Sequence, residues 1–169
     1  MAQGSDRPLR PNVGIALFNA AGLVFAGTAV GDGPETVLPG YEWQLPQGGI
    51  DPDEDIVLAA RRELREETGI EAVTLLAVTP DWWPYTFPPY DGPPHPMDAF
   101  SGQTQRWVAF RFIGDEASID IEHPPEGCIQ EFDTWAWLPL GSLPERVMPH
   151  KRENYLRLVD AFGRFAAPR

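Results

Sequence analysis

The 169 residues, 43% of them hydrophobic, suit one domain with an ordinary core and exclude an intrinsically disordered chain. The formal net charge of −12 argues against a DNA duplex or a long strand as partner, because basic patches bind such partners, but it leaves room for a small anionic substrate. A single cysteine, Cys128, excludes an intramolecular disulfide, and the lack of a membrane-spanning apolar run and of a signal peptide leads us to expect a cytoplasmic protein.

The first part of the chain predicts a flexible start, two strands and a loop. Residues 1–9 are polar and are expected to form a flexible N-terminus. The runs 12–20 and 23–30 are predicted to be strands that pair across a turn. Glycine and proline in residues 31–40 predict a loop, and residues 41–50 contain a short apolar strand that leads into a turn.

The middle of the chain predicts one well-defined helix, from Asp53 to Thr68. Acidic residues at its start favour a helix N-terminus, and good helix formers follow them. Gly69 is well placed as the C-cap, because glycine readily adopts the left-handed conformation that ends many helices. The apolar run at residues 71–79 predicts a further strand.

The last part of the chain predicts a long loop, two strands and a closing helix. Residues 80–101 are rich in proline and aromatic side chains and contain no lysine or arginine, and such a loop is long enough to cover a substrate. Strands are predicted at residues 104–113 and 132–140, and an amphipathic helix at residues 151–165. The elements together predict an α/β fold in a single domain, residues 10–167, with a mixed sheet and helices on both of its faces.

Three glutamates lie at helical spacing in the segment RRELREETG. Glu63, Glu66 and Glu67 are at positions i, i+3 and i+4, so their carboxylates project from one face of the helix. Like charges at this spacing are mildly destabilising unless something offsets them. The residues by themselves are compatible with a solvated acidic face or with a site for a hard divalent cation such as Mg²⁺.

The surroundings of these glutamates fit the pattern G-x5-E-x7-R-E-U-x-E-E-x-G-U, in which U is a bulky apolar residue. The matching positions are Gly48, Glu54, Arg62, Glu63, Leu64, Glu66, Glu67, Gly69 and Ile70. This segment resembles the signature of the Nudix hydrolases. The resemblance implies a Nudix fold, which is an α/β/α sandwich whose loop–helix–loop motif binds Mg²⁺, with Mn²⁺ or another divalent cation as a substitute. It also implies hydrolysis of a nucleoside diphosphate linked to another group.

The resemblance assigns roles to the residues of the motif. It implies that Glu63, Glu66 and Glu67 are catalytic metal ligands, with Glu67 or its neighbour assisting the attacking water. Gly48 belongs to the metal site because its backbone approaches the ion. Glu54, Arg62 and Gly69 are structural members of the motif, the first two through an ion pair that braces the loop.

The segments that flank the motif resemble the bacterial RNA pyrophosphohydrolase and (di)nucleoside polyphosphate hydrolase subfamily. They are RPNVGIALFN, WQLPQGGID, GQTQRW, EFDTWAW and HKRENYLRLV. This resemblance implies that Glu131 is a further metal ligand, whereas the alternative is an exposed glutamate at the start of a strand. The residues implied in substrate binding are Arg10, Gln47, Met148, His150 and Lys151.

Two further groups of side chains have open roles. Gln103 and Gln105 are candidates for orienting a water molecule. The aromatic residues of the 80–101 loop, Tyr85 among them, either stack on a nucleobase or pack on the surface. The loop is thus either a cover for the substrate or an ordinary surface connection.

Two departures from the subfamily bear on the substrate. Members that act on RNA often carry paired basic residues at the end of the second strand, where this chain has Gly27, Thr28 and Ala29. No lysine or arginine lies between Arg65 and Arg106, and this lack weakens contacts to RNA phosphates. The expected activity is removal of pyrophosphate from 5′-triphosphorylated RNA ends. The alternatives are hydrolysis of diadenosine tetra- or pentaphosphate and, from another class, a nucleotide-binding domain without turnover.

Overall fold

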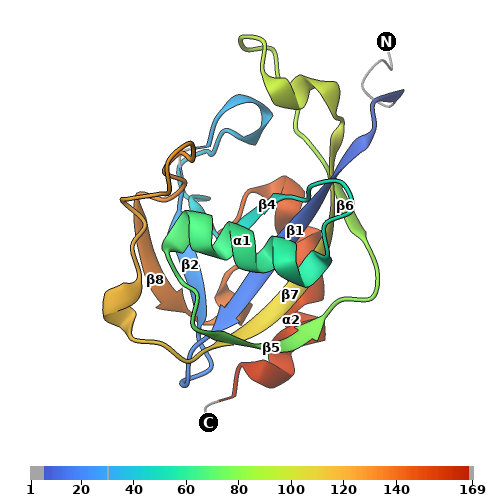
Figure 1. Ribbon diagram of the computed structural model, residues 1–169. Coiled ribbons are helices and arrows are strands. Elements are labelled where there is room, and N and C mark those ends of the chain that lie inside the picture. Colours follow the sequence, from blue (N-terminus) through green and yellow to red (C-terminus); the bar gives the residue numbers. More distant parts are fainter. Residues whose placement is uncertain (1–5, 30, 168–169) are drawn as a thin grey trace.

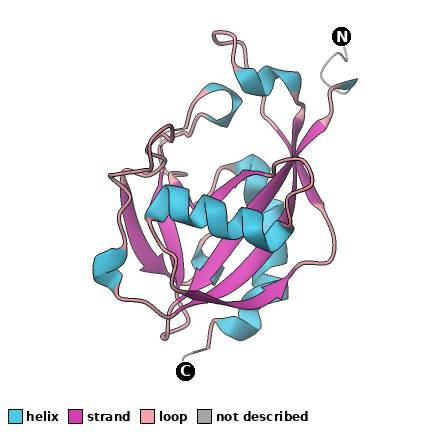
Figure 2. Ribbon diagram, in the orientation of Figure 1, coloured by secondary structure: helices cyan, strands magenta, loops and turns pink. Residues whose placement is uncertain are grey.

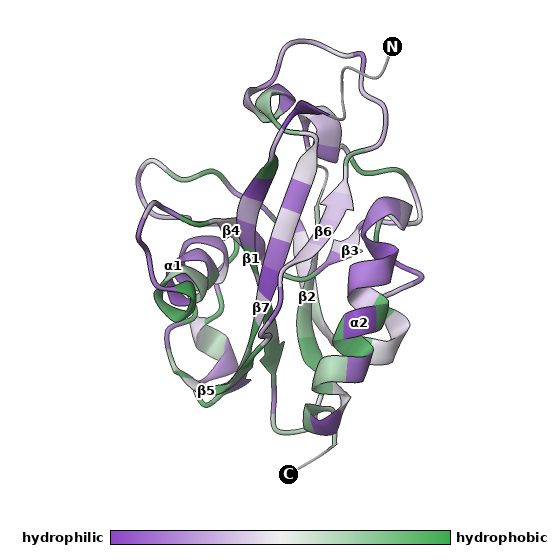
Figure 3. Cartoon of the chain, turned by 90° about the vertical axis from the view of Figure 1, so that its right-hand side faces the viewer, coloured by the Kyte–Doolittle hydropathy of each residue, from purple (hydrophilic) through white to green (hydrophobic). Residues whose placement is uncertain are grey.

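The computed structural model describes residues 6–29 and 31–167 and has three layers, with a mixed sheet between two helices (Figure 1). The strands are β1 (Leu9–Phe18), β2 (Val24–Thr28), β3 (Trp43–Gln44), β4 (Gln47–Gly49), β5 (Val73–Val78), β6 (Trp83–Thr86), β7 (Gly102–Phe112) and β8 (Thr134–Leu138). The helices are α1 (Ile56–Thr68) and α2 (Arg152–Phe162), and Figure 2 shows the short 3-10 turns between the elements as well. Seen along the sheet, α1 and α2 lie on opposite faces (Figure 3). The expected sandwich with a mixed central sheet is confirmed.

The two central strands, β1 and β7, are parallel along their whole length, from the pair Leu9–Gly102 to the pair Phe18–Arg111. Each strand changes its antiparallel partner on the way. β1 pairs with β4 around Val13 and with β2 at Phe18, while β7 pairs first with β6 and then with β5. The sheet therefore opens between β4 and the end of β2, and residues from both sides of this opening line the main cavity.

The core consists of two clusters, one on each face of the sheet. Along β1, Val13, Ile15 and Leu17 belong to the cluster under α1, and Ala16 and Phe18 belong to the cluster under α2. This division follows from the period of two in a strand, which points successive side chains to opposite faces. Because β1 is buried on both faces, it holds the site from the centre of the fold.

Helix α1 begins at Ile56, three residues after the predicted start at Asp53. The backbone of Asp53 has a φ of 62°, in the left-handed region that a helix cannot use. The carboxylate of Asp55 accepts hydrogen bonds from the backbone N–H groups of Val57 and Leu58, so Asp55 is the N-cap. Local propensity favoured an earlier start, and capping geometry decided the later one.

The loop predicted at residues 80–101 contains a strand, β6, which pairs with the start of β7. Strand β1 begins at Leu9, one residue before the expected domain start, and the backbone of Pro8 accepts a hydrogen bond from Ser101. The rest of the predicted flexible N-terminus, residues 1–5, lies outside the described residues, as does Val30 at the end of the second predicted strand. No helix in the described ranges is long and apolar enough to cross a membrane.

Candidate active site

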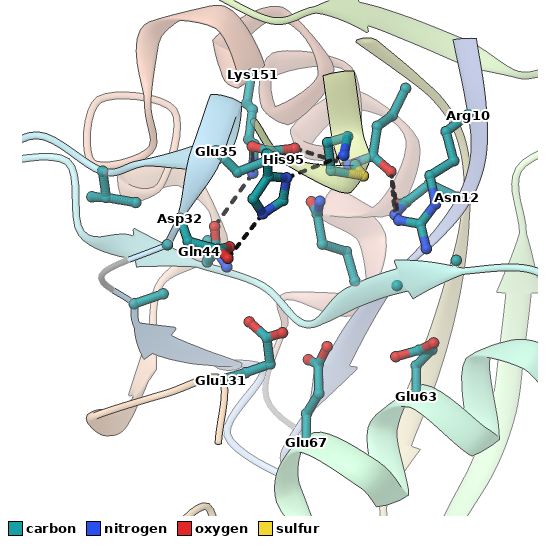
Figure 4. A pocket seen from close by; sticks show the side chains of 18 residues that line it. Arg10, Asn12, Asp32, Glu35, Gln44, Glu63, Glu67, His95, Glu131 and Lys151 are labelled. Atoms are coloured by element: carbon teal, nitrogen blue, oxygen red, sulfur yellow. Dashed lines mark hydrogen bonds and ion pairs between the residues drawn. The ribbon is translucent and has the colours of Figure 1, made fainter. Parts of the chain in front are cut away.

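A cavity of about 290 Å³, named the main cavity because Glu63 and Glu67 of the motif line it, lies where the sheet opens between β4 and β2. Figure 4 shows Glu63, Glu67 and Glu131 along one wall, with Lys151 and Glu35 across the cavity from them. Helix α1 supplies the first two glutamates, and the segment before β8 supplies Glu131. Elements far apart in the sequence therefore converge on one space.

Arg62 ties the helix to the turn before it. Its Nε and Nη2 atoms donate hydrogen bonds to the two carboxylate oxygens of Glu54, both at 2.8 Å, and Nη2 also donates to the backbone oxygen of Gly49 at 2.9 Å. The hydrogen bonds from Arg62 lower the pKa of Glu54 to about 2. Its Nη1 donates to Glu63 at 2.8 Å. A bidentate, charge-assisted pair of this kind holds the loop and the helix in one orientation.

The carboxylates of Glu63 and Glu67 are desolvated in the cavity wall. Burial raises the pKa of Glu63 to about 7, although Arg62 acts in the opposite direction. Burial also raises the pKa of Glu67 well above its ordinary value, and the negative charges of Glu131 and Glu63 add to the effect. The Oε2 atom of Glu67 is buried without a hydrogen-bond partner among the described residues. Such an arrangement costs free energy unless a positive group joins it.

Glu131 is largely exposed as a residue, yet its carboxylate points into the cavity beside Glu67 (Figure 4). Its pKa is raised by burial and by the neighbouring charge of Asp32. Glu66, in contrast, does not line the main cavity. Its carboxylate lies 3.4 Å from Nη1 of Arg62, and it lines a smaller hollow that Glu63, Glu67 and Glu131 share with it.

Gly48 and Gly49 belong to strand β4, which pairs with β1, and not to the turn predicted from the sequence. A Cβ atom on Gly48 would overlap the carboxylate of Glu63, and one on Gly49 would overlap the guanidinium group of Arg10, so a larger residue at either position would require one of these side chains to shift. Neither glycine has a positive φ, so the close approach to the site, and not the backbone conformation, distinguishes these positions.

These residues fit a hard divalent cation. Glu67 has an unpartnered buried oxygen, Gly48 leaves its backbone open beside Glu63, and the available donors are oxygens, which Mg²⁺ prefers. In residues 6–29 and 31–167, no three acidic, histidine or cysteine side chains are already arranged to hold a metal ion.

Side-chain amides form a continuous network along the base of the cavity. Asn12 donates to Gln103 at 3.0 Å and accepts from Gln105 at 2.9 Å. Gln105 also donates to Gln47 and accepts from Asn154 of α2, both at 3.1 Å. Gln103 and Gln105 therefore organise this wall through other amides, and Gln47 contributes to the cavity lining.

The predicted substrate residues differ in their access to the cavity. Arg10 lines it, and its Nη1 atom lies 3.3 Å from Oε1 of Gln103. Lys151 lines it too but is only 4% exposed, and its ammonium group forms an ion pair with Glu35 at 3.1 Å. Met148 and His150 are not among the lining residues. The Met148 sulfur accepts a hydrogen bond from the backbone N–H of Leu38, in the loop after β2. The ring of His150 packs edge-on against Tyr85, whose ring also lies near the ammonium group of Lys151.

The residues of the cavity that the sequence did not indicate include three from loops. Asp32 and Glu35 come from the predicted 31–40 loop, and His95 comes from the 80–101 loop. The ring of His95 bonds to Asp32 at 2.9 Å, which ties the two loops together. No periodicity marks such loop positions. Gln103 was a candidate from the sequence, but Asn12, on the neighbouring strand β1, was not, although both line the cavity.

The fold and the acidic cavity define a class, in which a loop–helix–loop presents glutamates beside a mixed sheet between two helices. A family model, the NUDIX domain, matches residues 8–158. The chain is 47% identical to an RNA pyrophosphohydrolase of Agrobacterium fabrum, over 95% of each chain. It is 44% identical to an RNA pyrophosphohydrolase of Brucella ovis, over 99% of this chain and 94% of the relative. The chain belongs to the Nudix family and is a Nudix hydrolase.

The fold agrees with a solved structure of low sequence identity. The Escherichia coli dihydroneopterin triphosphate pyrophosphohydrolase superposes with a TM-score of 0.62 at 14% identity, covering 92% of this chain and 99% of that one. At this identity the likeness concerns the fold alone. Nudix hydrolases generally use divalent metal cations, and the oxygen donors of the cavity suit that chemistry.

Proposed function

We propose that this Nudix hydrolase removes pyrophosphate from 5′-triphosphorylated RNA ends, with Mg²⁺ as its metal. The observation that carries the proposal is the cluster of Glu63, Glu67 and Glu131 in the cavity that Arg10 also lines: the pKa of each of the three carboxyl groups is raised, and one buried oxygen of Glu67 has no hydrogen-bond partner in the described ranges. The two relatives named RNA pyrophosphohydrolase support the substrate. We also propose that it acts in the cytoplasm, where a single cysteine stays reduced.

The residues of the cavity have separate tasks in this reaction. Glu63, Glu66, Glu67 and Glu131 would hold the metal, which polarises phosphoryl oxygens and neutralises the charge that develops on them. The guanidinium group of Arg10 lies beside Gly49 of β4 and would donate to phosphate oxygens, which orients the polyphosphate chain. Glu67, whose pKa is raised by burial, accepts a proton from the attacking water.

Hydrolysis of dinucleoside polyphosphates is the second candidate. The observation that favours it is the scarcity of cations beyond the cavity, since no lysine or arginine lies between Arg65 and Arg106. The loop after β2 adds a further acidic side chain to the cavity, that of Asp32. A compact substrate needs few contacts outside the cavity, whereas a long RNA gains most of its affinity from phosphate contacts.

One panel of substrates separates the two candidates. Triphosphorylated RNA oligomers and diadenosine tetra- and pentaphosphate are incubated with the protein and Mg²⁺ under the same conditions, and all products are identified. We expect pyrophosphate and 5′-monophosphorylated RNA, at a kcat/KM above that for the dinucleotides. Intact RNA beside consumed dinucleotides would overturn the substrate, and binding of both without any turnover would leave a nucleotide-binding domain.

Two controls test whether the turnover measured in this panel comes from this site. Chelation of the metal should stop turnover, and Mn²⁺ should restore it. Glu67→Gln should remain folded but inactive on every substrate of the panel. A contaminating phosphatase would be revealed by turnover that survives in this variant.

A further inference from the structure

We propose that Glu35 is an internal anion that occupies a phosphate-binding position beside Lys151, so that a substrate must displace it and must carry enough negative charge to do so. Glu35 thereby determines substrate specificity by charge. This inference rests on the proposed function, because it concerns the polyphosphate-binding wall of the same cavity.

The groups around the Glu35 carboxylate are those that bind a phosphate oxygen. Oε1 accepts hydrogen bonds from the Tyr85 hydroxyl at 2.7 Å and from Nε2 of Gln103 at 2.9 Å. Oε2 lies 3.1 Å from the ammonium group of Lys151 and 3.6 Å from Nε2 of His150. Four potential donors of N–H or O–H bonds thus converge on one anionic group.

The carboxylate fits this position incompletely. Burial by itself raises the pKa of Glu35, but Lys151 and the surrounding hydrogen bonds hold it well below the ordinary value, so the group is charged. Even so, Nε2 of His150 lies 3.6 Å from Oε2 of Glu35, beyond hydrogen-bond distance, and is buried without a hydrogen bond in the described part of the chain. A phosphate group has more acceptor oxygens than a carboxylate and has room to satisfy both Lys151 and His150.

The charges that line the cavity explain why the pairing of Glu35 matters for substrate binding. The lining residues with negative side chains are Asp32, Glu35, Glu63, Glu67 and Glu131, whereas Arg10 and Lys151 are the lining residues with positive side chains in the described ranges. As long as Glu35 pairs with Lys151, Arg10 alone remains to attract a phosphate. Displacement of Glu35 releases a second cation for the substrate.

Glu35 belongs to a short segment that can move without disturbing the sheet. It ends a three-residue 3-10 turn, Gly33–Glu35, which lies outside all strands. Gly31 precedes the segment and Gly33 is its first residue, and their φ values of 68° and 55° are conformations that glycine adopts at little cost. The hydrogen bond between Asp32 and His95 also restrains the segment. The Asp32 side chain is 78% exposed, so solvent weakens this interaction.

The donors around Glu35 continue toward the rest of the catalytic cavity. Gln103, which donates to Glu35, accepts from Arg10 at 3.3 Å. A polyphosphate that reached from Arg10 to Lys151 would therefore follow one wall. Replacing Glu35 with an anion of higher charge strengthens the contact to Lys151, but a ligand of low charge gains less than the displaced ion pair loses.

The decisive variant is Glu35→Gln, which keeps the shape of the side chain and removes its charge. In titration calorimetry of the full chain, we expect tripolyphosphate to bind about tenfold more tightly to this variant than to the wild type, a change of about 1.4 kcal/mol. Pyrophosphate should gain more than tripolyphosphate, which flattens the dependence of affinity on ligand charge. In the Mg²⁺-loaded enzyme, KM for triphosphorylated RNA should fall by a similar factor.

Matched variants separate charge displacement from a structural role. Glu71→Gln removes the same charge at an exposed site at the far end of α1 and should leave affinity unchanged. In Glu35→Gln/Lys151→Gln the gain should disappear, because the released cation is absent. Glu35→Asp, which keeps the charge on a shorter side chain, provides a smaller gain and a second test if the first variant does not fold.

The outcomes also distinguish this inference from the proposed function. Unchanged or weaker tripolyphosphate binding by a folded Glu35→Gln variant would overturn the internal anion and show that Glu35 only positions Lys151. A gain in affinity that persists without Lys151 would also overturn it. Failure to hydrolyse triphosphorylated RNA concerns the proposed function alone, since the calorimetric test requires neither metal nor turnover.

Discussion

The two walls of the cavity satisfy their buried charges in opposite ways. On the α1 wall, Glu67 has a buried carboxylate oxygen that accepts no hydrogen bond from the described residues. Glu63 accepts a hydrogen bond from Arg62, which is also bonded to other groups. On the opposite wall, Glu35 receives hydrogen bonds from Tyr85 and Gln103 and forms an ion pair with Lys151. The first wall is incomplete until a cation arrives, whereas the second is largely complete in the free protein.

This difference shows how one cavity can bind both a metal and an anion. Desolvated carboxylates favour a cation, because each lacks the water that would otherwise stabilise it. On the opposite wall, Lys151 is paired with Glu35. Its positive charge is therefore not available to form ion pairs with the carboxylates of the α1 wall across the cavity.

The largest effect is expected for Glu67→Gln on the incomplete wall. We expect kcat to fall by a factor on the order of a hundred or more, because a metal ligand and proton acceptor is lost. The free energy of unfolding without metal should not fall, since a buried unpaired carboxylate becomes a neutral amide. Steady-state kinetics and urea unfolding measure the two quantities, with Glu71→Gln as the control. Near-wild-type turnover would contradict the role of Glu67.

The metal-free protein should lose stability as the pH rises. Because burial raises the pKa of Glu63 from 4.5 to about 7, the folded state retains a proton that the unfolded state has released in this range. The free energy of unfolding in chelator should therefore fall by about 2–3 kcal/mol between pH 4.5 and pH 7. Below pH 4.5 the contribution of Glu63 to the free energy of unfolding is fully present. Urea unfolding across the pH range measures it.

Two variations sharpen the pH experiment. Glu63→Gln cannot release the proton and should show a smaller loss of stability over the same range. Saturating Mg²⁺ should reduce the loss as well, because the ion binds the deprotonated carboxylate. A rise in metal-free stability across this range in the wild type would mean that the carboxylates of the α1 wall are not desolvated.

Arg62→Ala should cost about 2 kcal/mol of stability, the usual size for hydrogen bonds to charged groups that are partly buried. The variant leaves Glu54 without its bidentate partner and releases the backbone of Gly49. Urea unfolding at neutral pH measures the loss. Arg65→Ala, an exposed neighbour on the same helix, is the matched control and should stay within about 0.5 kcal/mol of the wild type. Equal losses in both variants would remove the bracing role from Arg62.

The smallest effect is expected for Tyr85→Phe on the paired wall. The lost hydroxyl donates to Glu35 and accepts from Gln103 and Gln47, so unfolding should become easier by about 1–2 kcal/mol. Tyr90→Phe removes a hydroxyl that bonds only to an exposed loop backbone and should change stability by less. Thermal unfolding of the two variants ranks them, and the reverse ranking would show that the network around Glu35 is not cooperative.

The sequence by itself determined the parts of the site that are local along the chain. The spacing of Glu63, Glu66 and Glu67 places them on one helix face, and Gly69 adopts the predicted left-handed C-cap with a φ of 73°. The strands of the core followed from their apolar periodicity, as in β1. These features depend on neighbours within a few residues, and the period of a helix or a strand is enough to predict them.

Only the tertiary structure decided which distant residues meet. Glu66 turned out to face Arg62 beside the main cavity, and Lys151 proved to be buried against Glu35. The pairing of Glu35 with Tyr85 and Lys151 joins three segments that are at least 50 residues apart. No local pattern encodes such contacts, because they arise where the strands diverge and two loops pack together. The physical reason is that burial and charge pairing depend on the surroundings in space, whereas periodicity depends on neighbours in sequence.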